Sequence, residues 1–313
     1  MPLLYACVQE LRKIHGDGLP IHVIYDDQPV NDFKTLFLRL QGLIPGPKSY
    51  FLDFTNVFVT TCGTSFYKQC LPPHSVNLVF SSTAMHWLSE KPCDITGALS
   101  HTMITVPEEA VKFRSQAAKD WETIVLARAK EMASGGRMVL VQFAVDDEGQ
   151  FIGQTRKAAA SIHGTLRDLW RELRDEGLIT KDEFYRTTFI GYFRTVNEFK
   201  APFESPDSPV RKAGLSLISI ETKVVPCPYR EKWLQNRGDP VEHARWFIPS
   251  LRKWSNSTFI SALSDSRSPK EKESIVNELF KRYESEVAKR PEDHGGDYVH
   301  AYMVIAKNEK IGA

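Results

Sequence analysis

Apolar positions in the first 145 residues alternate between helical spacing and short continuous runs. Residues 3–14 carry apolar side chains at positions 3, 4, 7, 8, 11 and 14, which predicts a helix. The run IHVIYDD (21–27) predicts a strand that ends in two acids. A second helix is expected after it, with Asn31 or Asp32 as its N-cap.

Three further strands are predicted in this half, at 50–61, 75–82 and 137–145. A long amphipathic helix separates the last two; Pro107 suits its first turn, and Gly135-Gly136 is expected to end it. The resulting order, β-α-β-β-α-β, is typical of an α/β protein with a parallel sheet.

The second half of the chain has a different pattern. Residues 151–211 are expected to be helical up to a loop rich in Pro, Ser and Asp, PFESPDSPV. The remaining expected elements are strands at 215–226 and 297–307 and helices at 240–265 and 275–288.

Composition narrows the class of protein. A net charge of +1 and the lack of a basic stripe argue against a nucleic-acid partner. Five cysteines without a C-x-x-C pair indicate a reduced, cytoplasmic protein, and no metal site is expected. The N-terminal segment is too charged for a signal peptide, and no apolar run reaches the roughly 18 residues of a membrane span.

Two stretches near predicted strand ends could bind a cofactor. Asp27 ends its strand where α/β proteins commonly hold the hydroxyls of a ribose, although it could equally be a turn acid. In TTCGTSFYKQCLPP (60–73), Ser65 and Phe66 could lie along an adenine. The alternative is a turn that packs Phe66 and Tyr67 into the core.

The stretch VFSSTAMHWLSEKP (79–92) follows the third strand. A serine hydrolase would use Ser81 or Ser82 with His86, but the G-x-S-x-G elbow is absent. His86 and the indole N–H of Trp87 could instead donate to a substrate carboxylate. A third interpretation is a core tryptophan beside a hydrogen-bonded histidine. The residues alone leave these open.

Longer motifs carry a resemblance to a family. YDDQPVNDFKTLF resembles N-D-L-P-x-N-D-F-N-x-L-F, and SFYKQCLPPHSVNLVFSSTAMHWLSEKP resembles S-F-Y-x-R-L-F-P-x-x-S-L-H-F-x-H-S-S-Y-S-L-H-W-L-S-x-x-P. ASGGRMVLVQFA and FKRYESEVA are similar to P-G-G-R-M-V-L-T and F-x-R-Y-x-x-x-V-A. These are motifs of the SABATH family of carboxyl and N-methyltransferases, and the resemblance runs from about residue 1 to 307.

The resemblance implies an enzyme that uses S-adenosylmethionine to methylate the carboxylate of a small acid. The product is a methyl ester, and the body of the acid is expected to be apolar or aromatic. It assigns Asp27, with Gln28 beside it, to the ribose hydroxyls, and Ser65 and Phe66 to the adenine. Trp87 is expected to donate to the substrate carboxylate, with His86 lining the same pocket. No catalytic residue is expected, because a carboxylate is already an ionised nucleophile. The resemblance also implies a homodimer as the assembly to expect.

The implied fold is a Rossmann-like methyltransferase sheet with a helical cap. Its boundaries are a cofactor domain at 1–150, a cap insertion at 151–211, a returning strand at 212–229, a second cap segment at 230–264 and a final helix and strand at 265–313.

The family's first strand and its Gly-rich turn have no counterpart, and no G-x-G-x-x-G occurs. Without that central strand, residues 21–25 and 76–79 are expected either to close toward each other or to leave the sheet edge poorly ordered. Two accounts follow: a truncated version of an active enzyme, or a shortened relative that no longer methylates and acts by binding a partner.

Overall fold

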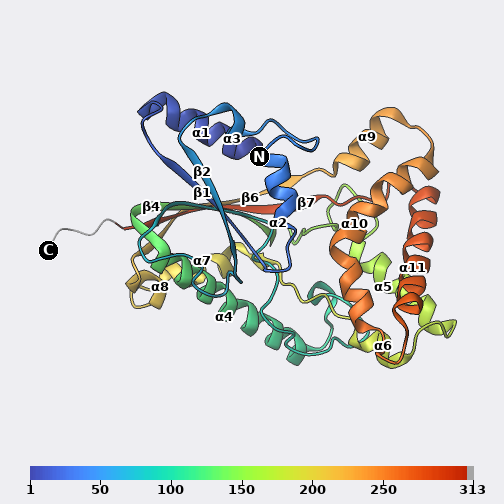
Figure 1. Cartoon of the computed structure of the whole chain (residues 1–313). Helices are drawn as coiled ribbons and strands as arrows, with labels where there is room; N and C mark the ends of the chain where they lie inside the picture. The colour runs from blue at the N-terminus through green and yellow to red at the C-terminus, as the bar shows by residue number, and fades with distance from the viewer. Residues whose placement is uncertain (309–313) are drawn as a thin grey trace. The chain divides into compact units, whose positions relative to one another are not determined.

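The computed structural model describes residues 1–308 of the chain (Figure 1). Two compact units divide at Ser75: an N-terminal unit, Met1–Ser75, and a C-terminal unit that begins at Val76. The predicted cofactor residues belong to the first unit, and His86 and Trp87 belong to the second.

The N-terminal unit has a two-stranded parallel sheet and three helices. Its elements in chain order are α1 (Pro2–His15), β1 (Ile21–Asp27), α2 (Phe33–Leu40), α3 (Tyr50–Asp53) and β2 (Val57–Gly63). The buried side chains of Val8, Leu40, Tyr50 and Val57 form its core. The parallel pairing of β1 with β2 brings their carboxyl ends to one edge of the sheet.

Local signals explain most of these boundaries. Asp32 caps α2, since its carboxylate accepts a hydrogen bond from the Thr35 N–H, as the sequence predicts. The strand expected at 50–61 is wrong in its first part: Tyr50–Asp53 is helical because the Ser49 hydroxyl caps that turn.

The C-terminal unit has a five-stranded sheet in the order β3-β4-β7-β6, with β5 paired to β4. Its elements are β3 (Val76–Ser82), the 3-10 helix η1 (His101–Met103), α4 (Pro107–Glu131), β4 (Met132–Val145), α5 (Ile162–Asp175), α6 (Lys181–Arg186), β5 (Arg194–Thr195), α7 (Val196–Glu204), α8 (Pro209–Lys212), β6 (Leu215–Val225), α9 (Pro228–Asn236), α10 (Pro240–Ala262), α11 (Pro269–Lys289) and β7 (Tyr298–Lys307). β3 and β4 are parallel, whereas β7 runs antiparallel to both β4 and β6.

Two groups of helices accompany this sheet (Figure 1). α4, α7 and α8 contact one another, and α7 and α8 contact β6. α5, α10 and α11 pack together around a second core that includes Trp170, Phe247 and Phe259. This helical group confirms the helices expected within 151–211 and from 240 to 288.

The boundary between α4 and β4 differs from the expectation. α4 ends at Glu131, and the strand already begins at Met132, so Gly135-Gly136 lies inside β4. A Cβ on Gly136 would lie 2.9 Å from the Ala133 carbonyl oxygen and 3.2 Å from that of Val76. The glycine therefore allows a close approach of β3 and β4 at a register shift, rather than stopping a helix.

The loop expected at 202–210 is also mostly helical. α7 continues to Glu204 with Pro202 inside it, and α8 begins at Pro209. The Ser208 hydroxyl accepts from the Arg211 N–H and caps α8.

The strands form two separate sheets among the described residues. β1 pairs with β2 in one sheet, and β3 is an edge strand that pairs with β4 in the other. β1 and β3 do not pair with each other, so the described strands do not form one continuous sheet.

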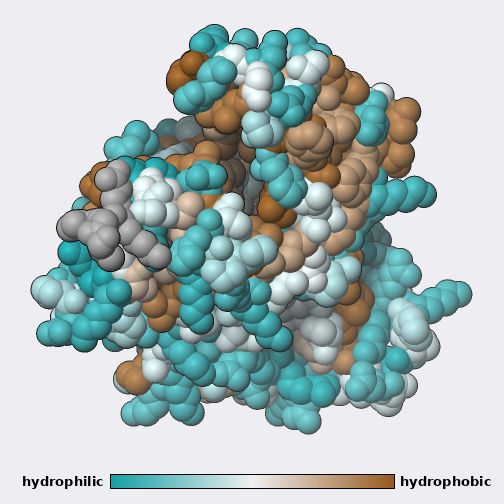
Figure 2. Space-filling model, turned by 60° about the vertical axis from the view of Figure 1, so that its left-hand side comes forward, coloured by the Kyte–Doolittle hydropathy of each residue, from teal (hydrophilic) through white to brown (hydrophobic). Residues whose placement is uncertain are grey.

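On the face seen in Figure 2, hydrophilic residues cover most of the lower part, whereas hydrophobic residues gather toward the upper right. Within residues 1–308, no helix combines the length and the apolar character that crossing a membrane requires.

Candidate functional site

Asp27 is the last residue of β1 and is exposed at the carboxyl edge of the N-terminal sheet. Its Oδ1 accepts from the backbone N–H of Gln28 at 2.7 Å, and its Oδ2 accepts from Asn31 Nδ2 at 3.0 Å. In its local geometry Asp27 is thus a turn acid, as the alternative interpretation predicted. This geometry does not exclude a ligand, because a carboxylate has about four lone-pair sites and these bonds use two.

Gln28 lies beside Asp27 in the turn that leads to α2. It is exposed, and its carbonyl oxygen accepts from the Asn31 N–H at 2.9 Å. Pro29, the next residue, packs on Gly63: a Cβ on Gly63 would lie 3.4 Å from the Pro29 Cα. Because Asp27 is the register partner of Gly63, this contact holds the turn beside the end of β2.

Ser65 and Phe66 lie on the loop that follows β2. The Ser65 carbonyl oxygen accepts from the Lys68 N–H at 2.9 Å, which makes residues 65–68 a turn. The rings of Phe66 and Tyr67 have centroids 4.7 Å apart and are half-buried. The structure therefore brings Asp27, Gln28 and this loop to the same edge of one small sheet.

In the C-terminal unit, Thr83 turns the chain at the end of β3 with a φ of 53°. The next residues are anchored on three sides: the Met85 N–H donates to Gln142 Oε1, Arg194 donates to the Met85 carbonyl oxygen at 2.8 Å, and the His86 carbonyl oxygen accepts from the Tyr192 N–H at 2.8 Å. Farther along, Ser89 is held by the buried carboxylate of Asp120. His86 and Trp87 are therefore fixed by the sheet, α4 and the segment before β5.

His86 is buried among aromatic rings. Its centroid lies 4.8 Å from that of Trp87, 4.9 Å from that of Phe143 and 6.0 Å from that of Phe193. Burial, with the positive charge of Arg194, lowers the pKa of His86 to about 3. The ring is thus neutral, and its Nδ1 has no hydrogen-bond partner in the described chain. The interpretation of His86 as a hydrogen-bonded core histidine is wrong for this atom.

Two more histidines contact Phe193, and sequence reasoning missed both. The His101 centroid lies 5.1 Å from that of Phe193, and the His163 centroid lies 6.0 Å from it. Burial lowers the pKa of His101 to about 3 and that of His163 to about 4. His101 and His163 are far apart in the sequence, so no motif spacing could predict that they lie close together. Only the tertiary fold brings them to Phe193.

Arg194 was also missed. Its guanidinium is buried and donates to the carbonyl oxygens of Met85 and Ala117, both at 2.7 to 2.8 Å. A buried cation close to His86 lowers that residue's pKa and would favour an anionic ligand in the same region.

The hydrolase geometry is not present. Ser81 Oγ accepts from Gln142 Nε2 at 3.3 Å, while Nδ1 of His86 is without a partner among the described residues. A serine nucleophile needs a base within hydrogen-bond reach, and this arrangement does not supply one.

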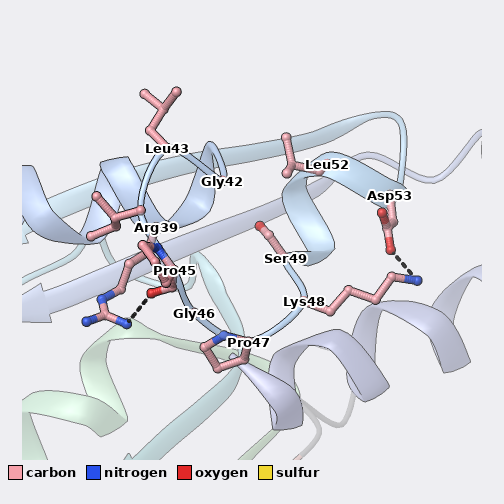
Figure 3. A pocket seen from close by; sticks show the side chains of 11 residues that line it. Arg39, Gly42, Leu43, Pro45, Gly46, Pro47, Lys48, Ser49, Leu52 and Asp53 are labelled. Carbon is pink, nitrogen blue, oxygen red and sulfur yellow. Dashed lines mark hydrogen bonds and ion pairs between the residues drawn. The ribbon is translucent and has the colours of Figure 1, made fainter.

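Two surface hollows lie away from the predicted residues. One, of about 460 Å³, is formed in the N-terminal unit by the loop between α2 and α3; Figure 3 shows Arg39 bonded to the Pro45 carbonyl and Lys48 paired with Asp53. The other, of about 660 Å³, surrounds Glu183 and Arg267 in the C-terminal unit. Neither is lined by any predicted site residue. The first is lined partly by Leu43, Pro45 and Leu52, and the second mainly by charged and hydroxyl side chains.

Comparisons with known proteins give the family. The family model described as SAM dependent carboxyl methyltransferase matches residues 4–308. A probable S-adenosylmethionine-dependent methyltransferase of Arabidopsis thaliana is 28% identical, covering 96% of this chain and 76% of its own. Anthranilate O-methyltransferase 1 of Zea mays and an inactive anthranilate O-methyltransferase of the same plant are each 24% identical, covering 99% of this chain and 79% of theirs.

A solved structure, loganic acid methyltransferase with SAH, superposes with a TM-score of 0.66 at 19% identity, covering 98% of this chain and 80% of the other. At that identity the likeness shows the methyltransferase fold alone. The family model, by contrast, matches nearly the whole length of the chain. This chain therefore belongs to the family of S-adenosylmethionine-dependent carboxyl methyltransferases.

Proposed function

We propose that this chain transfers the methyl group of S-adenosylmethionine to the carboxylate of a small acid whose body is apolar or aromatic. The observation that carries the proposal is the set of neutral, buried imidazoles and aromatic rings around His86 and Trp87 in the C-terminal unit. Such a lining suits an aromatic acid, like the anthranilate in the name of one relative.

The residues at the carboxyl edge of the N-terminal sheet fit the cofactor. Asp27 keeps unused lone pairs beyond its two turn bonds, so it can accept from two ribose hydroxyls. Gln28 is exposed next to it, and Ser65 and Phe66 offer a hydroxyl and a half-buried ring for the adenine. When bound, the cofactor supplies an electrophilic methyl group on a sulfonium.

The acid would be oriented by Trp87. Its indole N–H can donate to one carboxylate oxygen without transferring a proton, which leaves the other oxygen ionised for in-line attack. The neutral rings of His86 and His163 line a dry environment in which a desolvated carboxylate is a stronger nucleophile. The charge of Arg194 offsets part of the cost of burying that anion. Positioning and exclusion of water are enough, because no proton has to be removed.

A second candidate is a relative that binds without methylating. The separation of β1 and β3 into two sheets favours it, and an inactive protein occurs among the relatives. In this case the cofactor site would be incomplete, and a protein partner would be the ligand.

We also propose a cytoplasmic location, which the five free cysteines support. A homodimer is proposed on family resemblance alone, and a nucleic-acid partner is not proposed, given the net charge of +1.

Calorimetric titration of the purified chain with S-adenosylmethionine and with S-adenosylhomocysteine tests the proposal. Micromolar binding is expected for both, and the Asp27→Ala variant should bind at least tenfold more weakly. Asp17→Ala is the matched control, because Asp17 is an exposed acid of the same unit that lies on a different loop. A screen of aromatic and apolar carboxylic acids for methyl-ester formation follows.

Binding without ester formation from any acid would favour the second candidate. No heat from a folded, monodisperse sample would refute the proposed cofactor site itself.

A further inference from the structure

A cluster of two thiols and one carboxylate lies at the carboxyl edge of the N-terminal sheet. One ligand atom from each of Asp26, Cys62 and Cys70 lies within 4.8 Å of those of the other two. Asp26 is exposed, and the two cysteines are half-buried. The mechanism above does not use these three side chains.

The fold explains why they meet. Asp26 and Cys62 are register partners in the parallel ladder of β1 and β2. Cys70 returns to the same place through the loop 63–69, and the Cys62 thiol donates to the Cys70 carbonyl oxygen at 3.5 Å. The Cys70 thiol donates to the carbonyl oxygens of Ser65 and Lys68. The absence of a C-x-x-C pair hid this arrangement, because seven residues separate the cysteines and Asp26 comes from another strand.

Side-chain alternation separates this cluster from the proposed cofactor residue. Asp26 and Asp27 are consecutive in β1, so their side chains leave opposite faces of the two-stranded sheet. Asp27 faces the turn formed by Gln28 and Asn31, whereas Asp26 faces the cysteines. The cluster is therefore a distinct site on the other face of the same edge.

Two thiolates and a carboxylate are a ligand set for a thiophilic divalent cation. In a tetrahedral zinc site with Zn–S bonds of about 2.3 Å, neighbouring sulfur ligands lie about 3.8 Å apart. Ligand atoms within 4.8 Å need to close by about 1 Å at most, which side-chain rotation supplies. A water molecule would complete the coordination on the exposed side of Asp26, and each thiol would release its proton to solvent.

We propose that Asp26, Cys62 and Cys70 bind a zinc-class divalent cation that clamps the two ends of the loop 63–69. The clamp has a functional consequence that rests on the proposed methyltransferase activity: the clamped loop carries Ser65 and Phe66, so the ion stiffens the adenine side of the cofactor site. The metal site itself is independent of that activity.

Cobalt serves as the probe, since its thiolate complexes absorb through sulfur-to-cobalt charge transfer. The reduced, chelator-treated chain is titrated with Co²⁺, and one equivalent should produce a near-ultraviolet band that excess Zn²⁺ removes. Cys62→Ser and Cys70→Ser should each abolish the band, and Asp26→Asn should weaken binding at least tenfold. Cys7→Ser, which changes a half-buried thiol on α1 of the same unit, should leave the band unchanged.

A second measurement reports on the loop and needs neither cofactor nor turnover. Lys68 is exposed within the clamped loop, so Zn²⁺ should slow tryptic cleavage after Lys68 at least tenfold, and not in Cys70→Ser. Cleavage after Lys48, in the loop between α2 and α3, corrects for any effect on the protease.

A reduced, folded chain with no band, or a band that survives both cysteine substitutions, would overturn the metal site. So would recovery of a Cys62–Cys70 disulfide from the chain together with no band after its reduction. An inactive chain that still shows the band would leave the metal site intact while rejecting the proposed function.

Discussion

The backbone N–H of Phe193 donates a hydrogen bond of 2.9 Å to Nε2 of His101. A ring nitrogen that accepts carries no proton, so His101 is held as the neutral tautomer with its proton on Nδ1. Burial acts in the same direction and lowers its pKa to about 3. With His86 and His163, whose pKa values are also low, the C-terminal unit contains a group of imidazoles that stay uncharged at neutral pH.

This group predicts acid-sensitive stability. In the unfolded chain a histidine has a pKa of about 6.5, so below that pH the unfolded state binds more protons than the folded state. The stabilisation is complete above about pH 6.5 and is lost as the pH falls toward the folded pKa values. At pH 5 the buried His86 and His163 should each remove about 1–2 kcal/mol from the free energy of unfolding.

Urea denaturation at pH 7.5, 6 and 5 measures this loss. The His163→Phe variant retains an aromatic ring beside Phe189 and Trp254 and removes one titrating group. It should therefore lose less stability between pH 7.5 and 5 than the parent chain. An equal loss in both proteins would show that His163 is not among the groups responsible.

Substitution of Trp87 tests the proposed acid site. Trp87→Phe keeps a ring beside His86 and removes the N–H donor, and a hydrogen bond to a charged group is worth about 1.5–3 kcal/mol. With the best acid from the screen, kcat/KM should fall by about 10- to 150-fold. Affinity for S-adenosylhomocysteine should be unchanged, because the substitution leaves every proposed cofactor residue in place.

The control for Trp87→Phe is Trp246→Phe. Trp246 lies on α10 and is 46% exposed, so the same chemical change there should leave kcat/KM unaltered. Equal effects of the two substitutions, or none from Trp87→Phe, would remove Trp87 from the acid site.

Sequence periodicity predicted the strands at 21–27, 75–82 and 215–226 closely, because each is an apolar run with clear ends. It failed where a single contact determines whether a segment is a helix or a strand, or where an element ends. Ser49 converts the start of a predicted strand into a helical turn, and Gly136 permits a close approach of β3 and β4 instead of ending a helix. Propensity cannot register such contacts before the fold is known.

Of the residues around the proposed cofactor and acid sites, only those inside a family motif could be predicted from the sequence. The resemblance drew attention to Asp27 and Trp87; Asp27 is the last residue of β1, whereas Trp87 lies five residues beyond the end of β3. It gave no signal for Arg194 or His163, which come from β5 and α5 and approach His86 only through tertiary packing.

Glu183 is predicted to dominate the stability of the helical group at low pH. Burial raises its pKa, but hydrogen bonds from Arg267 and from the N–H groups of Ser264 and Thr180 outweigh that effect and lower the pKa to about 2. Since a carboxyl group in the unfolded chain titrates near 4.3, this contribution is present above about pH 4.3 and is lost as the pH falls toward 2.

Glu183→Gln should therefore lower the free energy of unfolding at pH 7 by about 3–5 kcal/mol, because it leaves the Arg267 guanidinium without its buried counter-charge. The difference from the parent chain should shrink between pH 4 and 2. Glu273→Gln, at an exposed position of α11, is the control and should cost less than about 0.5 kcal/mol. A difference that stays constant with pH would refute the assigned pKa.

Gly153 should be the least replaceable of the glycines in the segment between β4 and α5. It has a φ of +66°, and an added Cβ would lie 2.4 Å from Ile162 Cδ1 and 2.9 Å from its Cβ. The Gly153 N–H donates to the Asp297 carbonyl oxygen and its own carbonyl accepts from the Ile162 N–H, so the backbone cannot move away without breaking two hydrogen bonds.

Gly153→Ala should therefore lower the free energy of unfolding by more than about 3 kcal/mol, combining left-handed strain with overpacking. Gly149→Ala is the matched control. Gly149 has a φ of +76° but open space around it, so only the strain of about 1–2 kcal/mol applies. Urea denaturation of the two variants separates the backbone strain from the overpacking against Ile162. If both lose the same stability, the contact with Ile162 yields easily, and the start of α5 is not held in place by Gly153.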